Sequence, residues 1–495
     1  MRKQFQDGLD FGSSEQADTF NFLPAPDFPA QVSLQVHAAT ATSVSSTTQL
    51  VNSKSTITDV DYHWDGITFA QSGGYYPPDN ALAAGANVVI TAENDAIQIT
   101  TLQGTNPQTE SLATFFGSVM LSGYFLTDPR VLYDSVHHQF VVAVDEVSND
   151  LTTSNILLAV SRSDLATTSL ASTNWQFEWA STTHTLNGAT TWADQPLVSV
   201  DGTNIYVSTN QFSASGTYQG SVLSVFDDGL FTNGSTSNLV NWTQYTNPSY
   251  QTAAISGGGE YLVSYTHDIL SIFESNGGSN TTLSTVSLRN IDSGNGSYSA
   301  SQYGTRYKLD AGDGRITSAA YDSAHQKLYV VFEGQPGSSN STPSVEWAQL
   351  DMSGSSPVVL HTGNLNSLLL ATGATAGAAT FNGSVAVDTN GDVLFNFNVS
   401  GPHMYAADYF TFWKGAGSAI AATTPDFHAP IDYHDSVAAY VDPAHDAVAR
   451  WGDYSTAISD PAHPANGFYV SNEFDNGKVL GYSSWGTAVD HILLA

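Results

Sequence analysis

Near its C-terminal end the chain reads RWGDYSTAISD over Arg450–Asp460, followed after a short break by GFYVSNE over Gly467–Glu473. A polar lead-in with arginine, aspartate and tyrosine runs into a short apolar alternation, an acidic turn and a second alternating run. Alternation with a period of two is typical of β-strands, and turn-forming residues between two such runs are typical of a hairpin. The stretch therefore predicts an antiparallel strand pair with a polar cluster at its start.

The same pattern recurs along the chain from about residue 61, and no stretch has the period of an amphipathic helix. Seven hairpin-like units can be aligned. They lie at residues 81–90, 130–144, 197–208, 253–264, 318–331, 384–396 and 455–473. The second and fifth units match closely, since Tyr133–Ser135 corresponds to Tyr321–Ser323 and both are followed by a histidine and a glutamine. A repeated strand pair of this kind indicates a repeat architecture.

The units begin roughly 50 to 70 residues apart, and further short strands are predicted between them, for example at 96–101 and 155–161. Four strands per repeat at this spacing are typical of propeller blades. The sequence therefore predicts an all-β fold, a seven-bladed β-propeller over residues 61–495. Residues 1–60 are polar and interrupted by prolines, and they are predicted to form a short irregular N-terminal arm.

The charge balance is strongly acidic, because 46 acidic and 13 basic residues give a formal net charge of −33. Nucleic acids and anionic membranes need a basic surface, and so neither is expected as a partner. No apolar run reaches the length of a membrane span, so no membrane insertion is expected. The chain has no cysteine, which excludes disulfides and thiolate chemistry. A cation or a neutral polar ligand is favoured.

The composition is typical of an extracellular protein, with no cysteine, few lysines and many Ser, Thr, Asn and Gly residues. The residues that follow Met1 lack the apolar segment of a cleavable signal peptide. Secretion without a visible N-terminal signal is therefore predicted, and the protein is expected to be a monomer.

In a closed ring of blades, the residues just before each unit line one face, over the central channel. Five of the seven lead-ins carry an aspartate, and three of these also carry an arginine. The set comprises Asp79, Asp128, Asp194, Asp313 and Asp453, with Arg130, Arg315 and Arg450, and with Trp192, Trp451 and Tyr454. The return strands end on the same side with acids such as Asp145, Glu333 and Glu473. We therefore expect a polar site on this face.

Two interpretations of these residues stay open. In one, Asp–Arg pairs and hydrogen bonds from backbone to aspartate only hold neighbouring blades together. In the other the residues form a ligand site, in which clustered carboxylates bind a divalent cation such as Ca²⁺ or raise the pKa of one member for acid–base chemistry. The three arginines would then bind a carboxylate group, and Trp192, Trp451 and Tyr454 would stack on sugar rings.

The histidines are less informative than the acids, and a structural role is favoured for them over metal ligation. Four of them lie near Arg450, but their spacing matches no zinc template; they are His428, His434, His445 and His463. His137 and His325 fall in hairpin turns and are expected to be solvated. The run DTNGD at Asp388–Asp392 is similar to a calcium loop, but it lacks the distal glutamate and is interpreted as a turn.

Four spaced motifs carry a resemblance to a known group of proteins. They are PPDN at Pro77–Asn80, DPR at Asp128–Arg130, ADQP at Ala193–Pro196 and RWGDYS at Arg450–Ser455. Together they resemble large secreted bacterial β-propeller proteins with a sialidase-like fold, most of which have no assigned function. The resemblance covers roughly residues 62–475 and implies a seven-bladed propeller and an exported protein. The Asp-box repeat and the Arg-Ile-Pro signature of true sialidases are absent, so it implies no reaction.

The first functional expectation is an extracellular β-propeller that binds glycan or another cell-surface polymer through its acidic, aromatic-lined face, with Ca²⁺ as a candidate cofactor. A carbohydrate-active enzyme is the alternative, either a glycoside hydrolase with two carboxylates or a polysaccharide lyase with Tyr454 as base and an arginine that neutralises a uronate. A structural or adhesion protein is the third functional expectation. The catalytic candidates are Asp453, Tyr454, Arg450 and Asp128, and the ligand-binding candidates are Asp79, Arg130, Trp192, Asp194, Arg315 and Trp451.

Overall fold

The structure is a computed structural model that describes residues 58–494, except for the segments 228–238, 246–250, 255–258, 267–268, 277–278, 289–296, 336–341, 372–376, 418–424, 442–447 and 480–481. The predicted N-terminal arm lies outside the described residues apart from its last three positions, which begin a β-strand. His445 also lies outside them. Nearly all regular structure in the described part is β, arranged in eight sheets.

Three consecutive sheets come from the first half of the chain. The first holds β2 (Ala81–Ala84), β3 (Val88–Glu93), β4 (Ala96–Thr101) and β5 (Gln108–Ser111); the second holds β6 (Tyr124–Asp134), β7 (Gln139–Ser148), β8 (Ser154–Ser161) and β9 (Trp175–Ser181); the third holds β10 (His184–Leu186), β11 (Ala189–Val200), β12 (Asn204–Ser213), β13 (Tyr218–Asp227) and β14 (Leu239–Tyr245). Each is antiparallel throughout, with neighbouring strands joined in chain order.

Three similar sheets follow, and a fourth completes the series. They hold β15 (Gln251–Ala254), β16 (Glu260–Thr266), β17 (Ile269–Asn276) and β18 (Ser279–Ser287); β21 (Ile316–Asp322), β22 (Lys327–Gly334), β23 (Ser344–Asp351) and β24 (Val358–Asn364); β25 (Ala379–Val387), β26 (Val393–Gly401), β27 (Met404–Trp413) and β28 (Ile431–Asp435); and β30 (Thr456–Ser459), β31 (Gly467–Val479), β32 (Tyr482–Leu493) and β1 (Thr58–Thr68). The seven predicted hairpins are the first two strands of seven sheets, or in the third sheet β11 and β12.

A small eighth sheet and short helices complete the described part. The sheet holds β19 (Ser299–Ala300), β20 (Lys308–Asp310) and β29 (Val448–Ala449), and the helices are α1 (Leu112–Phe115), η1 (Ser172–Asn174) and α3 (Asn366–Ala371). β20 and β29 pair in parallel, which brings two distant segments together. Within the described residues no helix combines the length and the apolar character needed to cross a bilayer.

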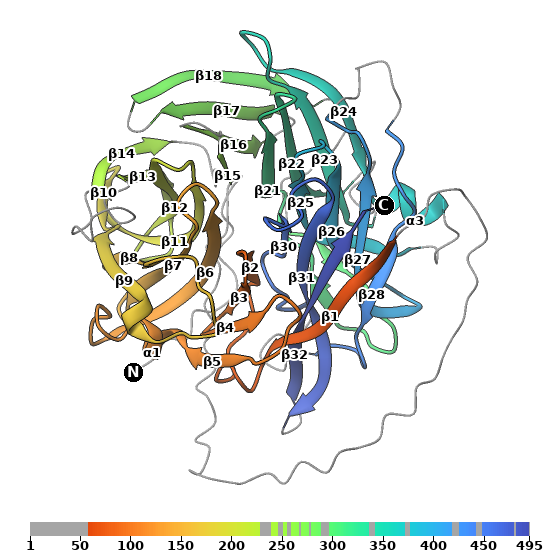
Figure 1. Cartoon of the computed structure of the whole chain (residues 1–495), viewed down its shortest axis with the longest axis horizontal. Helices are drawn as coiled ribbons and strands as arrows, with labels where there is room; N and C mark the ends of the chain where they lie inside the picture. Colours follow the sequence, from red (N-terminus) through yellow and green to blue (C-terminus); the bar gives the residue numbers. More distant parts are fainter. Residues whose placement is uncertain are drawn as a thin grey trace.

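The sheets follow one another around the molecule in chain order (Figure 1). The innermost strand of each sheet packs against that of the next, in the order β2, β6, β11, β15, β21, β25 and β30. β30 in turn contacts β2, so the series of contacts closes on itself. The last sheet is completed by β1, whose Thr58 pairs with Leu493 and whose Trp64 pairs with Val489 of β32.

Apolar clusters fill the space between consecutive sheets. One joins Val141 and Ile156 to Ile205 and Val207, a second joins Leu394 and Phe410 to Phe468 and Ile492, and a third joins Leu82 and Val89 to Tyr469 and Val489. The second strands are covered on both faces, which explains why β7 is buried at every position. Each fully buried aliphatic or phenyl side chain contributes about 1.5–3 kcal/mol, so these layers hold the sheets together.

The prediction of an all-β fold built from four-stranded antiparallel sheets is confirmed. The pairing of β1 with the last sheet and the three-stranded sheet around β20 were not predicted from the sequence. Asp388–Asp392 forms the hydrogen-bonded turn between β25 and β26, in which the Asp388 carboxylate accepts bonds from the backbone of Asn390 and Asp392, 2.9 Å each.

Candidate functional site

Four of the inner strands carry an unusual backbone conformation, either within the strand or just before it. Asp79, Asp128, Gln195 and Asn382 have φ between 52° and 56°, in the left-handed region. In β6, β11 and β25 this residue coincides with a shift of the hairpin register, as in a β-bulge. Aspartate and asparagine tolerate this conformation better than most side chains, and a bulge redirects the side chain it carries. The repeated bulge therefore turns a polar side chain toward the neighbouring sheet at equivalent places.

A chain of hydrogen bonds, which we call the polar belt, connects these positions. The belt consists of Asp453, Asp79, Asn94, Asp128, Gln195 and Arg315. The Asp453 amide donates to Asp79 Oδ1 over 2.8 Å, and Asn94 Nδ2 donates to Asp79 Oδ2 over 2.5 Å. The Asp128 amide then donates to Asn94 Oδ1 over 2.8 Å. These bonds join the last sheet to the first and the first to the second.

The belt continues through the third sheet. The backbone N–H of Gln195 donates to Asp128 Oδ2 over 3.3 Å, and Arg315 Nη1 donates to the side-chain oxygen Oε1 of Gln195 over 2.6 Å. Arg315 Nε also pairs with Asp313 Oδ1 at 2.8 Å. Asp79 and Asp128 are 1% and 3% exposed, so this part of the belt is buried between sheets. The interpretation of aspartates as links between blades fits both of them.

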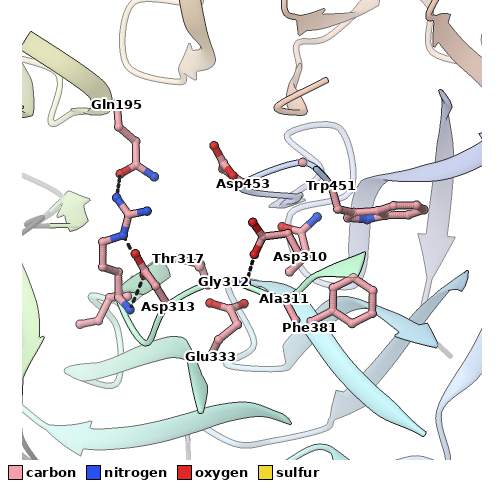
Figure 2. A pocket seen from close by; sticks show the side chains of 14 residues that line it. Gln195, Asp310, Ala311, Gly312, Asp313, Thr317, Glu333, Phe381, Trp451 and Asp453 are labelled. Carbon is pink, nitrogen blue, oxygen red and sulfur yellow. Dashed lines mark hydrogen bonds and ion pairs between the residues drawn. The ribbon is translucent and has the colours of Figure 1, made fainter. Parts of the chain in front are cut away.

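A pocket of roughly 430 Å³, its open mouth included, adjoins one end of the belt, and we call it the belt pocket. It is lined by Gln195, residues 310–313, residues 315–317, Glu333, Phe381, Asn382 and residues 451–453. Figure 2 shows the carboxylates of Asp310, Asp313, Glu333 and Asp453 around the same space. Asp310 reaches it from β20, so the small eighth sheet supplies part of the wall. The pocket is acidic, with Arg315 as a cationic side chain beside it.

Glu333 is the most deeply buried of the four pocket acids. It is 1% exposed, and burial raises its pKa to about 8, with Asp313 raising it further and Arg315 opposing the shift. Its Oε1 accepts a bond from the Gly383 amide over 3.0 Å, while Oε2 has no hydrogen-bond partner among the described residues. Gly312 passes so close that a Cβ there would lie 3.0 Å from Glu333 Cγ. Glu333 therefore carries a proton at neutral pH and is a potential hydrogen-bond donor.

Two more acids are buried next to the belt. Asp145 is fully buried, and both of its oxygens lack a hydrogen-bond partner in the described part of the chain. Burial and the neighbouring Asp128 raise its pKa well above the usual range, and Arg130 partly opposes this. Burial also raises the pKa of Glu473, although its Oε2 accepts a bond from the Gly452 amide over 2.6 Å.

These buried acids were expected on this face of the ring, at the ends of the return strands, but they were not among the catalytic or ligand-binding candidates. The sequence did contain a signal for them, because each lies on the return strand opposite a polar lead-in. Asp145 is paired with Thr127, the residue before Asp128. Glu333 follows Phe332, which pairs with Ile316, so it lies beside Arg315. The hairpin register therefore identifies them, whereas residue type alone does not.

Several predicted residues do lie at the site. Asp453 and Arg315 line the belt pocket, and Arg450 pairs with Asp453 at 3.0 Å. Asp194, in contrast, is displaced from the expected position. It is buried and pairs with Asn210, and its neighbour Gln195 occupies the belt position. The two prolines explain the displacement, because Pro196 corresponds to Pro129 and places Gln195 in register with Asp128.

The aromatic candidates are placed differently from the prediction. Trp451 lines the pocket but is fully buried, and its indole N–H donates to Asn398 Oδ1 over 2.9 Å. Trp192 is 1% exposed, donates to the Ser213 carbonyl over 3.1 Å and packs against Phe212. Neither ring offers an open face for stacking on a sugar, so that prediction was wrong for both.

Tyr454 does not fit the predicted role of general base. It is 1% exposed, its hydroxyl donates to the Pro129 carbonyl over 3.1 Å, and Arg130 Cζ lies 3.3 Å from the centre of its ring. Burial raises its pKa well above the ordinary value, and Arg130 opposes the shift. A phenol that keeps its proton in this way is a poor base. Arg130, which also donates to the Pro196 carbonyl over 2.9 Å, is a cross-sheet contact.

The Asp–His turns refine another expectation. His137, His325 and His463 each bond through Nδ1 to the aspartate three residues earlier in the same turn, at 2.6 Å in every case. His137 and His325 lie in hairpin turns as predicted but are only partly solvated, with side chains 23% and 30% exposed, because each fastens its own turn. The aspartates concerned are Asp134, Asp322 and Asp460.

Two groups of three potential metal ligands occur among the described residues, and neither lies in the belt pocket. They are His63, Asp65 and His434, and Asp460, His463 and His491, each with ligand atoms within 4.8 Å of one another. Ca²⁺ requires more ligands than the three of either group, and it prefers oxygen atoms to imidazole nitrogens. The described pocket carboxylates do not form such a set, so the pocket offers no ready calcium site.

Comparison with known proteins gives similarity of fold only. No protein-family model and no curated protein matches the chain. The β-propeller domain of the Trilobed protease from Pyrococcus furiosus is 9% identical, with 86% of this chain and 94% of that chain covered and a TM-score of 0.36. An α-L-arabinanase of Penicillium chrysogenum complexed with arabinobiose is 10% identical, with 88% of this chain and 96% of that chain covered and a TM-score of 0.39. A mutant Trypanosoma rangeli sialidase is 12% identical, with 74% of this chain and 54% of that chain covered and a TM-score of 0.34. Likeness at this level carries no conclusion about activity.

Proposed function

We propose that this chain is a seven-bladed β-propeller that acts outside the cell and binds a neutral glycan in the belt pocket. Seven sheets of at least four strands, whose innermost strands contact one another in a closed series, support the number of blades. The cysteine-free, lysine-poor composition supports secretion. The closure of the last sheet by β1 supports a ring whose two ends are fastened.

One observation carries the choice of ligand: four acids from three parts of the chain surround one pocket, and one of them holds a proton. Asp310, Asp313 and Asp453 offer acceptor oxygens, while protonated Glu333 offers a donor. Sugar hydroxyls donate and accept, so they complement this mixture. An anionic sugar would meet net negative charge, because Arg315 is already paired with Asp313. A neutral glycan is therefore favoured over a uronate or a sialic acid.

The test is a binding panel of neutral and acidic polysaccharides, measured by affinity electrophoresis and by titration calorimetry with oligosaccharides. Asp453→Asn and Glu333→Gln keep the size of the side chain and change what it donates or accepts. We expect each to weaken the binding of a neutral glycan about tenfold, which corresponds to roughly 1.4 kcal/mol.

Asp351→Asn is the matched control, because Asp351 ends β23 and does not line the pocket. Equal loss in the control and in the pocket variants would remove the pocket from the proposal. Retention of acidic polysaccharides alone would overturn the choice of a neutral ligand.

A glycoside hydrolase is the second candidate, favoured by the contrast between Glu333 and Asp453. Glycoside hydrolysis needs one protonated and one ionised carboxyl group near the scissile bond. Glu333 holds its proton to about pH 8, and Asp453 is paired with Arg450. Release of reducing ends that Glu333→Gln abolishes while binding persists would support this candidate. A polysaccharide lyase is not proposed, because its predicted base, Tyr454, does not line the belt pocket and its hydroxyl donates to the Pro129 carbonyl.

Absence of both binding and turnover over the whole panel would leave the third alternative, a structural or adhesion protein. Attachment of the purified protein to cell walls in a pull-down, unchanged by Asp453→Asn, is the result expected of such a protein.

A further inference from the structure

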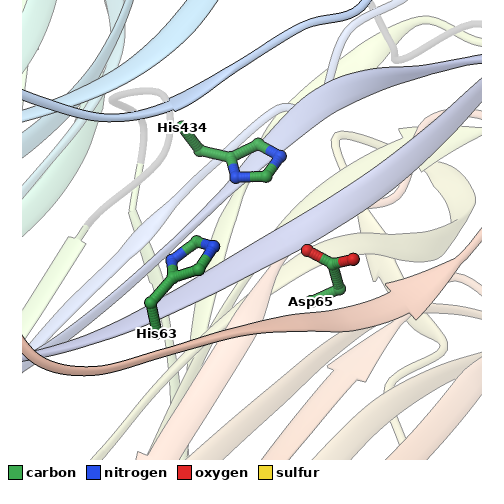
Figure 3. A group of neighbouring side chains, drawn as sticks. All are labelled: His63, Asp65 and His434. Atoms are coloured by element: carbon green, nitrogen blue, oxygen red, sulfur yellow. The ribbon is translucent and has the colours of Figure 1, made fainter. Parts of the chain in front are cut away.

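A cluster of His63, Asp65 and His434 lies far from the belt, at the outer edge of the ring. His63 and Asp65 are two residues apart on β1 and therefore project to the same side of that strand. His434 comes from β28, the outer strand of the neighbouring sheet. The two imidazole rings lie 5.2 Å apart with an angle of 22° between their planes. Figure 3 shows the rings and the carboxylate around a common space.

The orientation of His63 is set by a buried carboxylate. Its Nδ1 bonds to Asp490 Oδ1, and Asp490 is the residue opposite His63 in the register of β1 and β32. Asp490 is fully buried, whereas the His63 side chain is 38% exposed. When Nδ1 carries the proton toward a carboxylate, Nε2 of a neutral imidazole presents its lone pair. This carboxylate–histidine arrangement is the one that orients histidine ligands in metal sites.

The other two side chains are also available as ligands. Among the described residues the Asp65 carboxylate and the His434 ring form no hydrogen bond, although the His434 backbone bonds to the Asp432 side chain. The His434 ring packs against Phe474, 3.9 Å between centroids, which fixes it on one side. All three donors can therefore turn toward one ion without breaking an existing bond.

The second histidine group of the molecule has a different explanation. Asp460 Oδ2 accepts bonds from His463 Nδ1 at 2.6 Å and from His491 Nε2 at 2.9 Å, so hydrogen bonds already join its three members. The same Asp–His turn recurs at Asp134 and His137, without a third ligand. Hydrogen bonding accounts for that group, and it is not a candidate.

We propose that His63, Asp65 and His434 bind a first-row transition-metal dication, with Zn²⁺ as the reference ion, and that the ion fastens β1 to the neighbouring sheet. Two imidazoles and one carboxylate suit Zn²⁺ and not Ca²⁺ or Mg²⁺, which prefer oxygen ligands. Ligand atoms around tetrahedral zinc lie about 3.4 Å apart. The ligand atoms lie within 4.8 Å of one another, so binding requires rotations of about 1 Å by side chains of which His63 and Asp65 are exposed. A fourth position is left for water or an external ligand.

The experiment measures metal binding directly, on the full chain stripped with EDTA and in physiological salt that suppresses weak binding to surface acids. Calorimetry with Zn²⁺ and the visible absorption of Co²⁺ report on the site independently of any activity. We expect one equivalent of Zn²⁺ with at least tenfold weaker binding in His434→Ala and in Asp65→Asn. Tetrahedral Co²⁺ absorption should be lost in both variants.

His463→Ala is the matched control, because it removes an exposed histidine from the group that hydrogen bonding explains. It should bind Zn²⁺ as the wild type does. Thermal unfolding in EDTA verifies that each variant folds, and added Zn²⁺ should raise the melting temperature of the wild type and the control only. Unchanged stoichiometry and affinity in both His434→Ala and Asp65→Asn, or loss in His463→Ala alone, would overturn the proposal.

Discussion

Asp79 accepts one hydrogen bond from the backbone of Asp453 and one from the side chain of Asn94. Because it lies just before the first inner strand and Asp453 just before the last, a single carboxylate joins the two sheets where the ring closes. Its positive φ is part of the arrangement, since an ordinary extended residue would aim the side chain elsewhere. At the scale of the residue, the aspartates of the lead-ins are thus both structural links and neighbours of the pocket.

We predict that Asp79→Ala is strongly destabilising. The change removes two bonds, leaves a buried amide without an acceptor and places alanine at a positive φ. The expected loss in the free energy of unfolding is on the order of 3 kcal/mol, measured by urea denaturation. Asp79→Asn should lose clearly less, because it keeps one acceptor and tolerates the conformation. An alanine variant as stable as the wild type would show that the belt does not hold the sheets together.

Glu333 leads to a prediction about pH. In the folded protein the Glu333 carboxyl group keeps its proton up to about pH 8, whereas a free glutamate releases its proton near pH 4.5. Between these values the folded state binds more protons than the unfolded state, so the contribution of Glu333 to the unfolding free energy is complete below pH 4.5 and decreases as the pH rises toward 8. Glu333→Gln should remove that decrease, which amounts to a few kcal/mol. Denaturation curves at pH 5, 6.5 and 8 measure the difference, and equal slopes for both proteins would contradict it.

Residue type alone could predict that acids gather at the lead-ins, but not which of them reach the pocket. Gln195 takes the position expected of Asp194, because Pro196 corresponds to Pro129 and brings Gln195 into register with Asp128. Trp192 and Trp451 were expected at the surface, yet both fill space between sheets. The sequence contains no signal that distinguishes an aromatic ring that packs from one that binds, since both occur at the same positions of a strand.

At the scale of the element, β1 is the strand that local sequence could not predict. Its sequence, TDVDYHWDGIT, is polar and was assigned in part to the N-terminal arm. Its partner β32 lies more than 400 residues away, as the separation of 427 between His63 and Asp490 shows. Hairpin signals depend on turns between neighbouring strands, and this pairing has none.

We predict that deleting residues 1–68 leaves β32 as an open edge and lowers the melting temperature by several degrees. An unpaired edge strand also promotes association, so size-exclusion chromatography with light scattering should detect oligomers. Deletion of residues 1–57 is the control, because it keeps every described strand. A synthetic peptide of residues 58–68 should partly restore stability to the shorter chain. Equal behaviour of the two deletions would contradict a role for β1 in closing the ring.

At the scale of the whole molecule, the balance of 46 acids and 13 bases dominates the electrostatics. Ion pairs with arginine or lysine are few in the described part, whereas acids are spread over every sheet. The repeat of seven hairpins could be predicted from the sequence because each hairpin is local. The sheet of β19, β20 and β29 could not, because its parallel pair joins residues about 140 positions apart. That sheet brings Asp310 to the pocket.

Self-repulsion of this net charge predicts that salt stabilises the protein. Raising NaCl from 10 to 300 mM should increase the melting temperature by roughly 1 to 3 °C, because counterions screen the like charges. Differential scanning calorimetry measures the change, and choline chloride in place of NaCl controls for binding of a specific cation. A melting temperature that falls with salt would mean that attractive ion pairs outweigh repulsion.

The pairing of Thr58 with Leu493 places the outer ends of β1 and β32 directly opposite each other. A two-residue linker between these positions would turn the two strands into an ordinary β-hairpin. New termini could then be opened at the exposed turn around Gly216, between β12 and β13. Such a circular permutant should keep the same blades and the same pocket, so the starting point of the polypeptide is interchangeable around the circle.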